Sequence, residues 1–539
     1  MTKQTLWEKI TLAACTLKSV WLDLVVLQRL VFATVLLLFG GSFAEAQTVP
    51  FTPLHIYYIS PTGNDANPGT SPSKAWAGPR HNVVCGDVII AAPGSYAAEY
   101  SEFGPNTWGT VSNCPSTSGG IDGKGGIYFA TLLCAGPYVT SCSVNGGAYE
   151  AFRVDKSNWA VEGFTATQNS NGGNACYIAT SESNTTQHHI AFINDIAVNC
   201  NLAGISAVSW TSPGGVDQTA VVGAIVFNSA SSHADGICSS GVSIIPVDGP
   251  DTSAGTHVFV AGYFGYKNIN APSGAGCNTD GEGLIFDSWA CAKFTHQGVA
   301  EQNVWWYNGG PGFEVFPNCL SNGDRAQVYV FNNTSYGNAQ DPKHLGSSSD
   351  LLLGNIEPIS EYGSSYSVFD NIVVSTEATS GNAGKAPVYT AAFWVTKGAT
   401  LSLISATGNI FWQSNPGKST TAGNPNTDVW VGGVRNTTSF PFGTNTYQNP
   451  NFADPKVLPT EAPNCSGYTN TTACMNEGYH VAADLTSNET TTGFRGYPEP
   501  GACATDPFFP VWLKGVVFLQ WNGKTLTENQ GLITKPCDM

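Results

Sequence analysis

The sequence of 539 residues is poor in charged residues, and basic ones are the rarer kind. Asp, Glu, Lys and Arg make up only 11% of it, with 22 Lys and Arg against 39 Asp and Glu, so that the formal net charge is −17 and the pI is ≈ 4.8. Nucleic acids and anionic lipids bind through basic surfaces that offset their phosphates. We therefore expect no nucleic-acid partner.

Because charged residues are few, the helix formers Lys, Arg and Glu are scarce, and the polar residues that are present favour strands and turns. The chain has 60 glycines and is rich in Asn, Ser and Thr. These residue types are weak helix formers, whereas Thr fits strands and Gly, Asn and Ser fit turns. The composition predicts an all-β protein.

Motifs for zinc and nucleotides are missing. No two cysteines have the short spacing of a structural zinc site, and there is no Walker loop or dinucleotide fingerprint in a strand-to-helix context. Of the 15 cysteines, Cys15 lies in the first 46 residues and the other 14 lie beyond it. An even number predicts disulfides and an oxidising compartment, with Cys134 and Cys142, and Cys465 and Cys474, as plausible pairs.

The apolar run LVFATVLLLFGGSF at 30–43 follows several basic residues and ends near the small residues of AEA. This pattern predicts a signal peptide over residues 1–46, cleaved after Ala46. An uncleaved anchor is the alternative, but the run is shorter than the roughly 20 residues that span a bilayer. We expect a secreted protein, whether extracellular, periplasmic or at the cell surface, with no membrane span after cleavage.

Short alternating apolar runs separated by Asn and Gly recur from about residue 150, for example GAIVFNSAS, NVWWYNGG and AQVYVFNNTSYGN. Their irregular spacing of roughly 20 to 35 residues suits stacked coils, and no propeller signature accompanies it. We predict an N-terminal cap with the first strands over 47–149, a parallel β-helix over 150–455 and a disulfide-containing C-terminal cap over 456–539. The disulfides are expected in the caps, and a monomer is expected.

Four stretches carry a family resemblance: YYISPTGNDANPGTSPSKAW, TDGEGLIFDSW, VAEQNVWWYNGGPGFEVFPN and VYVFNNTSYGN. They resemble secreted right-handed parallel β-helix repeat proteins of the pectate-lyase-like superfamily, of the polysaccharide lyase family nine type, over about residues 55–455. The resemblance implies a right-handed parallel β-helix and calcium-dependent action on an acidic polysaccharide. It aligns Asp280 and Glu314 with two of that family's calcium-binding acids, whereas Gly310 and Pro311 stand where two further aspartates are expected.

The acids of NTDGEGLIFDSW have a chemical interpretation of their own. Asp280, Glu282 and Glu314 offer hard oxygen ligands for a divalent cation such as calcium, which would also bridge an acidic chain to an anionic polymer. We predict Lys293, Asp280 and Asp287 as catalytic residues, because eliminating a uronate needs a base and a proton donor. The alternative is turn chemistry, since Asp before Gly is a common turn pair and Asp287 can cap a strand end.

Aromatic residues and one histidine complete the predicted site. Trp289, Trp305 and Trp306 would stack on sugar rings if exposed, and His233 in SSHADG is the best histidine candidate for substrate binding. Because Trp305 and Trp306 are adjacent in a predicted strand, they point to opposite faces. The alternative for all three tryptophans is packing in the core.

Three functions follow from these observations. The favoured one is a secreted polysaccharide lyase-like enzyme acting on a uronic-acid-containing polysaccharide. A non-catalytic extracellular glycan-binding or structural β-helix protein is the alternative. A glycoside hydrolase that uses paired carboxylates is a further alternative, because such enzymes need only two acids flanking the bond.

Overall fold

The computed structural model divides the chain into two compact units, Met1–Thr48 and Val49–Met539, and all described residues except Thr48 belong to the second. The structure describes residues 48–96, 103–115, 127–136, 141–168, 175–181, 185–208, 214–230, 239–249, 255–269, 281–289, 294–316, 326–338, 354–357, 364–375, 391–395, 400–413, 429–431, 434–435, 443–447, 508–513 and 519–529.

Three long sheets account for most strands in these ranges. Sheet 1 contains β2 (Ile56–Ile59), β4 (Val88–Ala91), β7 (Ala130–Cys134), β10 (Trp159–Glu162), β13 (Ile190–Ile193), β16 (Thr219–Val222), β19 (Thr256–Ala261), β22 (Gln297–Glu301), β25 (Gln327–Phe331), β28 (Ser365–Phe369) and β31 (Ile404–Thr407). Sheet 2 contains β5 (Gly94–Tyr96), β8 (Cys142–Asn145), β11 (Phe164–Thr167), β14 (Ile196–Val198), β17 (Ile225–Phe227), β20 (Phe264–Tyr266), β23 (Val304–Trp306), β26 (Thr334–Tyr336), β29 (Ile372–Ser375) and β32 (Ile410–Gln413). Sheet 3 contains β9 (Phe152–Val154), β12 (Tyr177–Ala179), β15 (Ile205–Ala207), β18 (Val242–Ile244), β21 (Leu284–Asp287), β24 (Phe313–Phe316), β27 (Gly354–Glu357), β30 (Ala391–Val395), β33 (Val429–Val431) and β34 (Val434–Arg435).

Smaller elements lie outside these sheets. Strands β1 (Thr48–Phe51), β36 (Leu526–Asn529) and β35 (Leu519–Trp521) form a three-stranded sheet, and β3 (Val83–Val84) pairs with β6 (Val111–Ser112). The described residues include three short 3₁₀ helices, η1 (Pro72–Lys74), η3 (Leu401–Leu403) and η4 (Val511–Leu513). None of the helices in the described ranges is long and apolar enough to cross a membrane.

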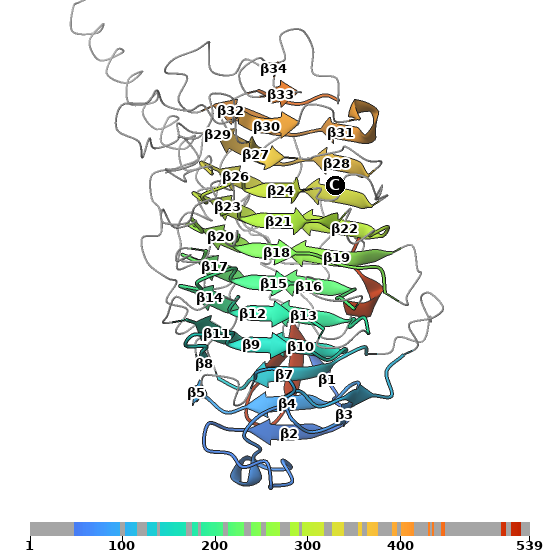
Figure 1. Cartoon of the computed structure of the whole chain (residues 1–539). Helices are drawn as coiled ribbons and strands as arrows, with labels where there is room; N and C mark the ends of the chain where they lie inside the picture. Colours follow the sequence, from blue (N-terminus) through green and yellow to red (C-terminus); the bar gives the residue numbers. More distant parts are fainter. Residues whose placement is uncertain are drawn as a thin grey trace, which may run out of the picture. The chain divides into compact units, whose positions relative to one another are not determined.

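Each coil supplies one strand to each sheet in turn. Strands β19, β20 and β21 follow one another along the chain, and each pairs in parallel with the equivalent strand of the next coil, β22, β23 and β24. In Figure 1 the strands of sheet 3 lie in the middle of the view, between those of sheet 2 and sheet 1. Parallel crossovers of this kind are right-handed in nearly all proteins. The prediction of an all-β, right-handed parallel β-helix is confirmed.

The corner between sheets 1 and 2 explains the recurrent Asn and Gly. Its first residue has a positive φ in coil after coil, so Gly or Asn is favoured there. The residues concerned are Gly163, Asn194, Gly223, Gly262, Gln302, Asn332, Asp370 and Gly408.

In the later coils the next residue of this corner is Asn, and these asparagines form a ladder. Asn333 Oδ1 accepts the backbone N–H of Asn303 at 2.8 Å, and Asn333 Nδ2 donates to the Ala300 carbonyl at 2.9 Å. The same pattern continues through Asn371 and Asn409. Because these side chains are buried, each rung satisfies backbone groups that water does not reach.

Apolar side chains from all three sheets fill the space between them. On β21, Leu284 and Phe286 point into this interior, whereas Ile285 and Asp287 alternate with them on the outer face. Stacking of equivalent residues, such as Phe152 on Tyr177 with ring centroids 4.8 Å apart, repeats from coil to coil.

The described part of the predicted C-terminal cap packs along sheet 1. Residues Phe509, Trp512 and Leu513 join an apolar cluster on the outer face of that sheet, and the Trp512 indole donates to the Thr256 carbonyl at 2.9 Å. Strands β35 and β36 pack further along, against the outer side of β4 and β7. These described residues of 456–539 therefore cover a sheet face rather than the last coil.

Three disulfides are described. The predicted pair Cys134–Cys142 is confirmed, and Cys85–Cys114 also lies in the N-terminal part. Cys176–Cys200 lies within the coils of 150–455, so the expectation that disulfides belong to the caps is wrong for this pair. The predicted pair Cys465 and Cys474 lies outside the described residues.

Candidate active site on the outer face of sheet 3

The outer face of sheet 3 carries two of the described acids of the predicted site, Asp287 and Glu314. Asp287 ends β21 and Glu314 lies on β24, the neighbouring strand, where Glu314 is in register with Ile285 and Asp287 with Phe316. Both carboxylates follow inward-facing residues, so both lie on the outer side. From a strand spacing of about 4.8 Å and a rise of about 3.3 Å per residue, their Cα atoms are about 8 Å apart.

Asp287 lies in a partly buried environment that favours its protonated form. Burial raises the pKa of this carboxyl, while a hydrogen bond from the Ser288 hydroxyl, 2.7 Å from Oδ1, acts in the opposite direction. A carboxyl whose pKa is raised in this way is suited to donate a proton to a leaving group.

Glu314 has a second acidic neighbour that the sequence analysis missed. In the next strand, β27, Glu357 is in register with Glu314, so their Cα atoms are about 4.8 Å apart. Glu314 itself is 8% exposed. The only signal in the sequence is the stretch GNIEP one coil later, and no fixed spacing connects it to GFEVF.

The same register continues into aromatic positions. Two strands beyond β24, Trp394 on β30 occupies the position equivalent to Glu357 by backbone pairing, and Trp430 on β33 is in register with Trp394. On the other side of Glu314, the residues in register with it are Ile285 and then Ser243.

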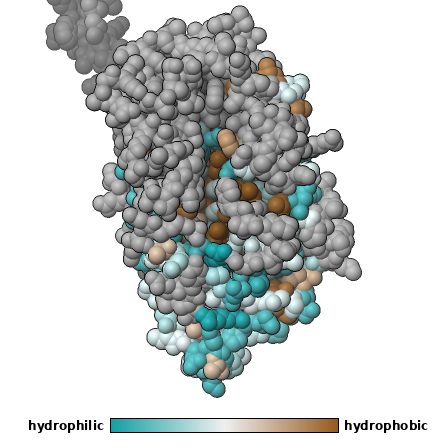
Figure 2. Space-filling view, in the orientation of Figure 1, coloured by the Kyte–Doolittle hydropathy of each residue, from teal (hydrophilic) through white to brown (hydrophobic). Residues whose placement is uncertain are grey.

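Hydrophobic residues gather in the middle of the view in Figure 2, and hydrophilic residues lie over its lower part.

Glu282 lies apart from this outer face. Its side chain is 1% exposed, and the Ser240 hydroxyl donates a hydrogen bond to its Oε2 atom. This contact joins the turns that precede β18 and β21, and Gly241 N–H also donates to the Glu282 carbonyl at 2.7 Å. The structure gives Glu282 a role in joining coils, and its predicted role as a metal ligand stays a prediction.

Three predicted site residues, Asp280, Lys293 and His233, lie outside the described residues. Among the residues that are described, no group of three or more His, Cys, Asp or Glu side chains is arranged to hold a metal ion. Calcium binding by Asp280, Glu282 and Glu314 stays a prediction.

The predicted sugar-stacking role of the three tryptophans is wrong in this structure. Trp289 and Trp305 are 1% and 0% exposed and belong to the interior cluster, where the Trp289 indole donates to the Ile244 carbonyl at 3.0 Å. Trp306 points to the outer side of sheet 2, as adjacency to Trp305 requires, but it is also 0% exposed and stacks on Tyr336 with ring centroids 4.2 Å apart. A ring without an exposed face cannot bind a sugar.

Comparisons with known proteins identify similar structures only. No family model matches the sequence, and no curated protein matches it. Among solved structures, the chain is similar to the pectate lyase Pel9A, with 15% identity over 75% of this chain and 84% of that chain and a TM-score of 0.39. It is also similar to an alginate lyase from Paenibacillus sp. str. FPU-7 (12% identity, 65% and 93% covered, TM-score 0.32) and to a rhamnogalacturonan lyase (13% identity, 68% and 89% covered, TM-score 0.33).

Proposed function

We propose that this chain is a secreted, carbohydrate-active enzyme that cleaves an acidic polysaccharide on the outer face of sheet 3. The observation that carries the proposal is the placement of Asp287 and Glu314 on the same face of adjacent strands, with Glu357 in register one strand further on. The described disulfides support secretion, because such bonds persist in oxidising compartments.

The favoured chemistry is β-elimination on a uronic acid. Calcium prefers carboxylate oxygens, which Glu314, Glu357 and the predicted ligand Asp280 would supply; when bound, it would offset the substrate carboxylate and acidify the C5–H group. Asp287 would give a proton to the departing glycosidic oxygen, consistent with its raised pKa. Lys293, six residues further along the chain, would remove the C5 proton.

Hydrolysis is the second candidate, and one observation favours it. Asp287 and Glu314 lie on the same face of adjacent strands with Cα atoms about 8 Å apart, which allows their carboxyl groups to reach the separation of about 6.5 to 9.5 Å found in inverting glycosidases. In that case Asp287 would be the general acid, and Glu314 would activate a water molecule.

The test incubates the full chain with polygalacturonate, alginate and rhamnogalacturonan, with calcium or with a chelator. A lyase gives the ultraviolet absorbance of an unsaturated uronate product, whereas a hydrolase gives new reducing ends without it. We expect Asp287→Asn to lower kcat about 100-fold or more, because a general acid contributes on that order. Glu314→Gln should lower kcat to a similar extent, because Glu314 would be a calcium ligand in elimination and the general base in hydrolysis. Asp65→Asn, which removes the same charge in the turn after β2, serves as the control.

Turnover that is unchanged in both variants would overturn this assignment of the site. Binding of a uronan without either product would instead support the non-catalytic glycan-binding alternative.

A further inference from the structure

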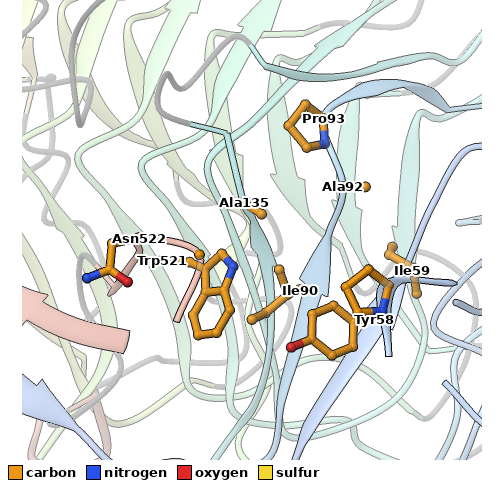
Figure 3. Close-up of a pocket in the computed structure, with 10 residues that line it drawn as sticks. Tyr58, Ile59, Ile90, Ala92, Pro93, Ala135, Trp521 and Asn522 are labelled. Carbon is orange, nitrogen blue, oxygen red and sulfur yellow. The ribbon is translucent and has the colours of Figure 1, made fainter. Parts of the chain in front are cut away.

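A pocket of about 450 Å³ lies on the outer face of sheet 1, at a distance from the carboxylates of sheet 3. Its walls come from the first strands of that sheet, from the end of β35 and from the turn that follows it, and they include Tyr58, Ile90, Pro93, Trp521 and Asn522 (Figure 3). This volume lies in the usual range for small-molecule sites, about 300 to 1,000 Å³. Strand β4 lines the pocket, and β22 belongs to the same coil as β24, which carries Glu314. Within sheet 1, β4 and β22 are six strand spacings apart, so the pocket and Glu314 are separated by about 30 Å along the stack of coils.

Two aromatic rings flank the pocket. Tyr58 and Trp521 lie on either side of Ile90 in Figure 3, and both rings are only partly buried. The two rings come from distant parts of the chain. They lie near each other because the β35–β36 hairpin packs against the outer side of β4 and β7 through Leu519 and Leu526. The packing of the hairpin therefore creates the pocket, and it leaves part of each ring facing solvent.

Polar atoms at this pocket are suited to hydroxyl groups. Within the described residues, neither the Tyr58 hydroxyl nor the Trp521 indole N–H has a hydrogen-bond partner, so both remain available to a ligand. Asn522, by contrast, holds its own turn, since its Oδ1 accepts the N–H groups of Lys524 and Thr525. The pocket thus combines aromatic planes with two hydrogen-bonding groups at their edges.

The pocket lining has no charged side chain, which disfavours an anionic ligand. None of the residues that line the pocket is Asp, Glu, Lys, Arg or His. Moving a carboxylate into mostly apolar surroundings without a paired charge is costly, whereas hydroxyl groups lose little when they regain hydrogen bonds. An uncharged sugar satisfies both conditions, because its ring carries C–H groups on its faces and hydroxyl groups at its rim.

We propose that this pocket binds an uncharged pyranosyl residue of a glycan, through stacking on Trp521 and Tyr58 and hydrogen bonds at their polar tips. It is a binding site without catalytic residues, on a different sheet from the candidate active site. The proposal does not depend on cleavage at sheet 3, since the two sites would recognise sugars of different charge.

The experiment titrates the full chain by calorimetry with cellohexaose, mannohexaose, xylohexaose, galactohexaose and, as the charged counterpart, hexagalacturonate. We expect at least one neutral hexasaccharide to bind, and Trp521→Ala to weaken that binding about tenfold or more. Tyr58→Phe, which removes only a hydroxyl group, should weaken it severalfold. Tyr149→Ala, which removes another exposed aromatic side chain outside the pocket, should leave it unchanged.

Two results would overturn the proposal: no binding of any neutral hexasaccharide at millimolar concentration, or equal binding by the wild type, Trp521→Ala and Tyr58→Phe. Because Trp521 also helps to anchor the hairpin, the urea midpoint of each variant is measured in parallel. If Trp521→Ala is destabilised, Tyr58→Phe decides the outcome. Loss of hexagalacturonate binding in Glu314→Gln, with neutral binding retained, would separate the two sites.

Discussion

The asparagine ladder offers the sharpest test of what holds the coils together. We consider Asn333→Ala, because Asn333 is 0% exposed and does not have a positive φ, so alanine adds no backbone strain. Its side chain accepts the N–H of Asn303 at 2.8 Å, and donates to the Ala300 carbonyl and to Asn371 Oδ1, each at 2.9 Å. Truncation removes all three hydrogen bonds.

The magnitude follows from burial. Each hydrogen bond contributes about 1 kcal/mol net, and the buried N–H of Asn303, left without an acceptor, costs about 1 to 3 kcal/mol more. We therefore expect Asn333→Ala to lower the free energy of unfolding by about 4 kcal/mol. Asn445→Ala is the matched comparison, because Asn445 makes equivalent bonds to Asn409 and Ala406 but is only partly buried. Water can replace its bonds, so we expect about 1 kcal/mol.

The assay is urea unfolding followed by intrinsic fluorescence, with comparison of midpoints and slopes. A stack of repeats can unfold in stages, so an unchanged slope is required before the two free energies are compared. Equal losses of unfolding free energy in the two variants would contradict this prediction, because they would show that burial of the ladder does not set its contribution.

Three further predictions concern the site, the core and a disulfide. Because the pKa of Asp287 is raised, its neutral form stabilises the fold at pH values below the unfolded pKa, and this contribution is lost as the pH rises through the folded pKa. The melting temperature of Asp287→Asn should therefore rise relative to that of the wild type between pH 4 and pH 8. A difference in melting temperature that does not change with pH would contradict this prediction. Trp305→Ala should cost about 3 to 5 kcal/mol in chemical denaturation, since the ring is fully buried, and a loss below 1 kcal/mol would argue against an interior position. Replacing Cys176 and Cys200 together by Ser should cost about 3 kcal/mol for a loop of 24 residues, as measured by urea unfolding without reductant. Reductant also cleaves the other two described disulfides in both proteins, so the difference between wild type and variant should largely disappear in reductant, and a difference that persists would contradict the assignment to this bond.

The kind of fold and the local direction of many side chains were predictable from the amino-acid sequence. Alternation of apolar residues with Asn and Gly at the bends predicted the coils, because a strand has a period of two and a left-handed bend favours those residue types. For the same reason the opposite directions of Trp305 and Trp306 were predictable. The pair Cys134–Cys142 followed from a separation of only eight residues.

The sequence did not reveal which residues of different coils lie side by side, or which side chains are buried by other segments. Loops of variable length separate the coils, so no spacing along the chain revealed that Glu357 is in register with Glu314. Burial of Trp306 depends on contacts such as that with Tyr336, 30 residues away, and the pocket between Tyr58 and Trp521 joins residues from opposite ends of the chain. Local sequence patterns fix backbone conformation and side-chain alternation, whereas register and burial arise from packing between segments that are distant in sequence.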